Sequence, residues 1–129
     1  KTPKDQIINV EYTRDNSKKK AVYKKSKAIH LKSDIDSIYT STEKAARWYK
    51  ASVSSTKKRK AVTLSKDSVG GGFKFCVYQK GKRLKTVRVT KNDKVKTVKL
   101  PKKKGTYYVK VTKLTSKTTG AYYLGTYTY

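Results

Sequence analysis

One histidine and one cysteine are the only side chains of their kinds in this sequence, and together they could form a base and a nucleophile. They are His30 and Cys76. A catalytic thiol needs a base within hydrogen-bonding reach, so this is the single dyad that the composition offers. Cys76 falls between Phe75 and Val77 in an apparent strand, where a small buried thiol is the commoner role. We therefore expect no catalytic dyad.

Paired carboxylates are the other catalytic candidates, because two of them can cleave a glycosidic bond. Asp34, Asp36 and Glu43 could supply such a pair. One member must act as a general acid with a raised pKa, and the surrounding lysines would lower the pKa of a carboxyl group instead. The sequence thus predicts a protein that is not an enzyme.

The sequence contains only weak motifs for a metal site or a phosphate-binding loop. Zinc needs clustered Cys and His ligands, which are missing here. Calcium prefers several oxygen ligands, and Asp34 with Asp36, or Asp15 with Asn16, are the only concentrations of them. Asp residues in such places more often cap turns. The glycines at 70–72 precede a strand-like segment instead of the helix that a phosphate loop requires. We expect a turn there, and neither a metal nor a cofactor.

Positive charge dominates the composition. Lys and Arg total 34 against 8 Asp and Glu, which gives a formal net charge of +26 in 129 residues, and only five of the 34 are Arg. Proteins that read nucleic-acid sequence favour arginine forks, and none of their motifs appears. Lysine is a compact point charge suited to diffuse attraction. The expected partners are repeating anionic polymers such as teichoic acids, anionic lipid surfaces, or nucleic acid bound without sequence preference.

Local lysine runs are the predicted contacts to such a polymer. Each run taken singly is also what a solvated surface would carry, but the total charge is harder to explain in that way. The predicted polyanion contacts are Lys57, Lys58, Arg59, Lys60, Lys102, Lys103 and Lys104.

Tyrosines form a second candidate surface. Alternation in the segments 106–112 and 121–129 places one set of side chains inward and another outward. We expect the outward set to give one sheet an exposed face of tyrosine and lysine. That face could be cross-strand packing or a platform for sugar rings or an extended peptide. The predicted ligand-binding residues are Tyr78, Tyr108, Lys110, Tyr123 and Tyr127.

Short strand-like runs separated by polar or glycine-containing turns must position these residues. They predict an all-β fold, a single antiparallel β-sandwich or barrel, with at most one helical turn, within residues 34–47. The length suits one domain over residues 1–129. The expected strands cover residues 6–12, 21–23, 28–31, 48–53, 60–64, 73–78, 84–89, 95–100, 106–112 and 121–129.

Five phrases in the second half resemble the bacterial pre-peptidase C-terminal domain. They are RWYKASV at 47–53, FKFCVYQKG at 73–81, VKLP at 98–101, GTYYVKV at 105–111 and GAYYL at 120–124. The resemblance covers residues 34–129 and leaves 1–33 as additional N-terminal strands. It implies a jelly-roll-like β-sandwich of secreted bacterial proteins, usually attached to proteases and other hydrolases. The family includes collagen-binding modules of clostridial collagenases, which bind through a tyrosine-bearing sheet face.

This sequence departs from that family in two respects. These 129 residues include no catalytic domain, and lysine replaces most of the family's acidic residues. Asp34-Ile35-Asp36 resembles the family's Asp-x-Asp motif but is displaced from Trp48 by an extra stretch, and with so few other acidic residues we do not predict calcium binding.

These observations predict a non-catalytic, exported module that attaches to anionic cell-wall or extracellular polymers of a Gram-positive bacterium. A removed signal peptide is expected, since the chain starts at Lys1, and no stretch approaches the roughly 20 apolar residues of a transmembrane helix. Two alternatives remain open. One is a nucleic-acid-binding protein without sequence preference, and the other is an adhesin-type module that binds protein, including collagen, through the tyrosine face.

Overall fold

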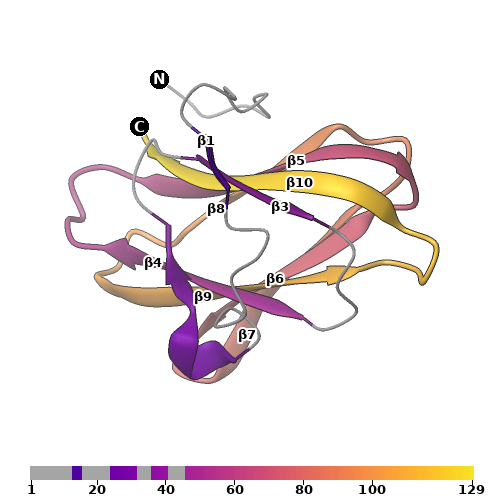
Figure 1. The fold of residues 1–129 in the computed structure, drawn as a ribbon. Coiled ribbons are helices and arrows are strands. Elements are labelled where there is room, and N and C mark those ends of the chain that lie inside the picture. Colours follow the sequence, from indigo (N-terminus) through magenta and orange to yellow (C-terminus); the bar gives the residue numbers. More distant parts are fainter. Residues whose placement is uncertain (1–12, 16–23, 32–35, 41–45) are drawn as a thin grey trace.

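Two five-stranded sheets pack face to face in the computed structural model, which describes residues 13–15, 24–31, 36–40 and 46–129 (Figure 1). Sheet A has the strand order β1-β3-β10-β5-β8, and sheet B has the order β2-β4-β9-β6-β7. The predicted all-β sandwich is therefore confirmed. The elements are β1 (Thr13–Asp15), the 3-10 turn η3 (Lys25–Lys27), β2 (Ile29–His30), β3 (Asp36–Thr40), β4 (Arg47–Val53), β5 (Lys60–Gly70), β6 (Phe73–Gln79), β7 (Lys82–Val89), β8 (Val95–Lys99), β9 (Gly105–Lys113) and β10 (Thr119–Thr128).

Most strand pairs are antiparallel, but the N-terminal part of the chain adds two parallel ones. β1 runs parallel to β3 and β2 runs parallel to β4. The helical turn expected within residues 34–47, with Ser41 or Thr42 as its cap, falls largely outside the described residues, and strand β3 precedes it at Asp36–Thr40. The expected strands at 6–12 and 21–23 lie outside the described residues.

Alternation along the strands builds the core. In β4 every second residue is buried, from Arg47 to Val53, and the intervening side chains are half-buried. β9 follows the same pattern, so that Tyr107, Val109 and Val111 meet the inner residues of β4 in register. Burial of these apolar side chains supplies the main stabilising free energy of the sandwich.

Tyrosines also join the two sheets across the core. The hydroxyl groups of Tyr49 on β4 and Tyr122 on β10 lie 2.5 Å apart in a hydrogen bond. The Tyr122 ring meets the edge of the Phe73 ring with centroids 4.9 Å apart. Because β4 and β6 belong to sheet B and β10 to sheet A, these contacts span the layer between the sheets.

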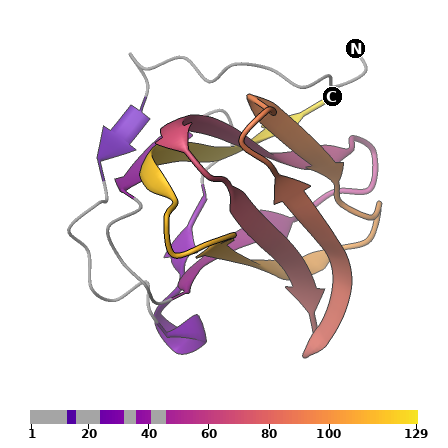
Figure 2. The ribbon, with the colours of Figure 1, turned by 90° about the vertical axis from the view of Figure 1, so that its right-hand side faces the viewer.

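Five of the six connections from β4 to β10 cross between the sheets, so the loops collect at two ends. One end holds the loops 54–59 and 100–104 with the β6–β7 turn, and the other holds 71–72, 90–94 and 114–118. The first two loops lie together on the left of Figure 1, and Figure 2 views the sandwich from the opposite end. We call the first end the basic end.

Two turns show why glycine occurs where it does between the strands. The β6–β7 turn has positive φ at Lys80 (52°) and Gly81 (77°), which is the geometry of a tight two-residue hairpin. At the opposite end Gly71 also has positive φ, 70°. A Cβ at Gly72 would lie 2.0 Å from the Val89 carbonyl oxygen, so a larger residue cannot be placed there. The glycine triplet is thus a tight turn between two strands.

The core layer predicts a sharp contrast between two leucines. Leu124 is fully buried, whereas Leu84, the extra residue of a β-bulge in β7, is 40% exposed. We expect Leu124→Ala to lower the free energy of unfolding by about 2–5 kcal/mol. Leu84→Ala should change it by less than about 0.5 kcal/mol. Urea unfolding of both variants checks this, and equal losses would contradict the assigned core.

Candidate anion-binding site

The fold brings the two predicted lysine runs to the same end of the sandwich. Arg59 exchanges two backbone hydrogen bonds with Tyr129, of 3.1 and 2.9 Å. The Leu100 N–H donates to the Lys60 carbonyl oxygen at 2.8 Å, and Arg59 Nε donates to the Leu100 carbonyl oxygen at 3.1 Å. The run at 57–60 therefore lies beside the start of the loop that carries Lys102, Lys103 and Lys104, which are exposed.

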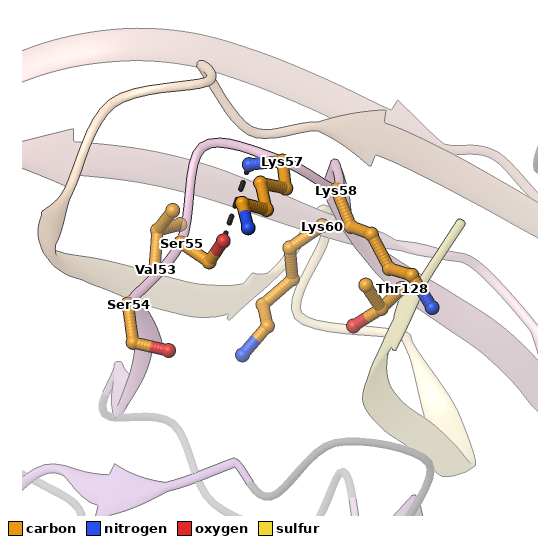
Figure 3. Close-up of a pocket in the computed structure, with 7 residues that line it drawn as sticks. All are labelled: Val53, Ser54, Ser55, Lys57, Lys58, Lys60 and Thr128. Carbon is orange, nitrogen blue, oxygen red and sulfur yellow. Dashed lines mark hydrogen bonds between the residues drawn. The ribbon is translucent and has the colours of Figure 1, made fainter.

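A hollow of about 310 Å³ opens at this end between the β4–β5 loop and the end of β10 (Figure 3). Three predicted polyanion contacts, Lys57, Lys58 and Lys60, line it. The remaining lining residues are Val53, Ser54, Ser55 and Thr128. Three lysines and three hydroxyl-bearing residues thus line one small open space.

Lys60 is the lysine most firmly held in this hollow. It is the first residue of β5 and pairs with Thr128 in register, on the side of the strand that faces sheet B. Its Nζ reaches across to β4 and donates to the Ser52 carbonyl oxygen at 2.6 Å. An ammonium group has three N–H donors, so two remain for a ligand. The side chain is half-buried, and its stem fills the open edge of the core.

The β4–β5 loop is ordered by its own hydroxyl. The Lys57 backbone N–H donates to Ser55 Oγ at 3.2 Å, the bond drawn as a dashed line in Figure 3. A hydroxyl that accepts in this way still has its own proton to donate. Ser54 and Ser55 are both exposed, at the rim of the hollow.

Acidic residues are scarce in the part of the sequence that forms this end. Residues 44–129 contain 24 of the 34 basic residues and only two of the eight acidic ones, Asp67 and Asp93. Asp93 lies in the loop at the opposite end, where its Oδ1 is 3.8 Å from Lys96 Nζ. The segments 52–60, 79–82 and 99–105 carry no Asp or Glu. Among the described residues, the only charged side chains that line the hollow are lysines.

The predicted tyrosine face is divided between the two sheets, so its description as one surface is wrong. Tyr78, Tyr108 and Lys110 lie on β6 and β9 of sheet B, whereas Tyr123 and Tyr127 lie on β10 of sheet A. The cause is the loop 114–118, which crosses from one sheet to the other. Outward residues of β9 and β10 therefore point away from opposite sides of the sandwich.

On sheet B a cluster of rings and lysines does form, and it includes two residues that the sequence prediction missed, Lys25 and Trp48. The Trp48 ring lies 5.5 Å from the Tyr78 ring, centroid to centroid. Lys110 Nζ lies 5.5 Å from the Trp48 ring centroid, and Lys25 Nζ lies 4.8 Å from that of Tyr108 and 5.9 Å from that of Trp48. These are cation–π distances. We call Lys25, Trp48, Tyr78, Tyr108 and Lys110 the aromatic–lysine face.

Alternation alone puts Trp48 outward, because its neighbour Tyr49 is inward. Its partners could not be read from the sequence, because they depend on register. Trp48 pairs with Lys110, which pairs in turn with Cys76, while Lys50, Tyr108 and Tyr78 form the adjacent row.

The candidate dyad of His30 and Cys76 does not form. His30 is on β2 and Cys76 on β6, with β4 and β9 between them in the sheet, a separation of about 14 Å at the usual strand spacing. His30 Nε2 lies 3.4 Å from Ser52 Oγ. The buried Cys76 thiol lies 3.5 Å from Thr86 Oγ1, which agrees with the packing role predicted for it.

The calcium candidates cannot be placed, because Asp34 and Asn16 lie outside the described residues, as does Glu43. Within the described part of the chain, no three His, Cys, Asp or Glu side chains gather as metal ligands would. The same part of the chain contains no helix long and apolar enough to cross a membrane.

A known structure shares this fold. The 1.0 Å crystal structure of the pre-peptidase C-terminal domain of collagenase from Bacillus anthracis matches with a TM-score of 0.53 and 15% sequence identity. The match covers 98% of this chain and 99% of that one. The fold implied by the sequence resemblance is thus confirmed, and the match extends well beyond residues 34–129. No family model and no curated protein matches this sequence.

Alkaline titration tests the environment of the aromatic–lysine face. Burial raises the pKa of Tyr78, and its neighbour Cys76 raises it further. An unfolded tyrosine ionises near pH 10. The neutral phenol therefore contributes stability below that pH, and this contribution is lost as the pH rises through the higher pKa of the folded protein. We expect wild type to lose stability relative to Tyr78→Phe above pH 10.

Thermal unfolding of both proteins between pH 8 and 11 measures this difference. Parallel curves would contradict a raised pKa at Tyr78.

Proposed function

We propose that this protein is a non-catalytic binding module that attaches to anionic polymers through its basic end. The observation that carries the proposal is the meeting of two lysine runs at one end of the sandwich, beside an open hollow that no Asp or Glu of the described residues lines. A polymer with repeating negative charge could contact several of these lysines at once. Each such contact releases condensed counterions, which favours binding.

The proposed ligand is an anionic cell-wall polymer of the teichoic-acid type or a similar extracellular polymer. Lysine supports this choice over sequence-specific nucleic-acid recognition, because most cations at the basic end are ammonium groups without the planar fork that reads base edges. The fold shared with a domain of a bacterial collagenase is compatible with export from a Gram-positive cell. Attachment would be to the polymer chain as a whole, with modest selectivity for its repeating unit.

A second candidate function rests on the aromatic–lysine face. Stacked or tilted rings with lysines above them could bind single-stranded nucleic acid, whose bases stack on aromatic side chains while its phosphates contact cations. The same face could bind an extended protein such as collagen, through tyrosine contacts. Both versions predict that Trp48→Ala or Tyr108→Ala abolishes binding, whereas binding through the basic end should survive these changes.

Sedimentation with isolated Gram-positive cell walls tests the main proposal. We expect the bound fraction to fall steeply as salt rises, because screening shortens the reach of exposed charges. Walls stripped of their anionic polymer should bind little protein. Equal binding to intact and stripped walls would contradict the proposal.

A matched pair of charge variants locates the contact. Replacing Lys57, Lys58, Lys103 and Lys104 by Gln removes four charges from the basic end. Replacing Lys91, Lys94, Lys113 and Lys117 by Gln removes four from the opposite end. We expect the first variant to lose at least about tenfold in affinity for walls and the second much less. Equal losses in the two variants would show that net charge alone drives binding.

A further inference from the structure

We propose that the hollow at the basic end holds one phosphate group. This inference rests on the proposed function and deepens it, because it names the chemical group of the polymer that is bound. Every polar side chain that lines the hollow can donate a hydrogen bond. Lys57, Lys58 and Lys60 supply ammonium groups, and Ser54, Ser55 and Thr128 supply hydroxyl groups. None of the described residues that line it is an Asp or Glu, so the lining itself does not repel an anion.

Lys60 is the central donor because it is already in place before a ligand arrives. Its bond to the Ser52 carbonyl oxygen, 2.6 Å long, fixes the ammonium group between the two sheets. A free lysine side chain loses rotamer entropy when it binds, and a side chain held in advance loses less. The remaining N–H groups of Lys60 are therefore better placed for an anion than those of the exposed Lys102, Lys103 and Lys104.

The donor set distinguishes phosphate from carboxylate. A carboxylate is planar and is held best by the two parallel N–H groups of an arginine fork. The arginine of this end, Arg59, does not line the hollow, and its Nε donates to the Leu100 carbonyl oxygen. Separate ammonium and hydroxyl donors on several sides suit a tetrahedral oxyanion. Figure 3 shows them on different sides of the space, from the β4–β5 loop, β5 and β10.

The hollow can also accept a phosphate that is part of a chain. Its volume of about 310 Å³ leaves room for groups on either side of the phosphate, and it opens at the end of the sandwich. Phosphodiesters of a wall polymer and of a nucleic acid share this chemistry. The assigned ligand is therefore the phosphodiester, and its source is decided by experiment.

Titration of the isotopically labelled protein with inorganic phosphate and with glycerol phosphate, at constant ionic strength, tests the site by NMR. Backbone amides of residues 54–60 and 128 should shift with a saturating curve. Lys60→Met should weaken phosphate binding by at least about tenfold, the loss expected for a hydrogen bond to a charged group. Lys103→Met removes the same charge from the same end, outside the hollow, and should weaken it by less than about twofold.

Because Lys60 also bonds to Ser52, a second variant separates binding from folding. Thr128→Val keeps the shape of an exposed side chain and removes only its hydroxyl group. It should leave the melting temperature unchanged and weaken phosphate binding by several-fold. Acetate that shifts the same amides with the same affinity as phosphate would overturn the assignment, as would equal losses in Lys60→Met and Lys103→Met.

Polymers of matched charge then identify the source. Poly(glycerol phosphate) and a single-stranded oligonucleotide should both depend on Lys60, and the polymer that loses more affinity in Lys60→Met is the better match. Polyglutamate should also bind in a salt-dependent manner, but its affinity should be the same for wild type and Lys60→Met. If all three polymers bind equally in wild type and Lys60→Met, the phosphate site is refuted while the proposed function stands. If only small phosphates bind, the polymer function fails and the site remains.

Discussion

The two sheets have to close over one apolar layer while a large excess of positive charge stays outside it. β5 shows how this constraint is met, because its inward side reads Lys60, Val62, Leu64, Lys66. The two apolar residues lie in the core, and the lysines at either end extend past it. Lys60 donates to the Ser52 carbonyl oxygen at one end, and Lys66 donates to the Lys91 carbonyl oxygen at 2.7 Å at the other. Backbone carbonyl groups thus receive charges that could not be buried unpaired.

The same constraint connects stability with binding. Few carboxylates are available, so lysines make contact with carbonyl oxygens and aromatic rings, which carry only partial negative charge. Neither neutralises the repulsion among like charges, and a net charge of this size opposes the compact state. A polyanion at the basic end would relieve part of that repulsion. Binding should therefore stabilise the fold as well as anchor it, since any ligand of the folded state shifts unfolding by mass action.

Alternation of side chains was sufficient to predict the strands in the second half of the chain. The inward tyrosines and valines of 106–112 are the buried ones in β9, and the turn at Gln79–Lys82 is a hairpin. Prediction failed where contacts depend on which sheet a strand joins. Tyr108 and Tyr123 were expected on one face but lie on opposite sheets. It also missed the strand at Asp36–Thr40, which pairs with β10 and is too short to stand out by its own alternation.

The sequence by itself determined that the protein is a β-sandwich covered with lysine, because a period of two and an excess of Lys over acidic residues are local properties. Only the tertiary structure decided that residues 57–60 and 100–104 meet, since crossings between the sheets bring distant loops to one end. It also decided which lysine is held in place, because the carbonyl group that positions Lys60 belongs to a strand of the other sheet. The lysine content is a property of the sequence, whereas the meeting of two lysine runs at one end depends on sheet topology.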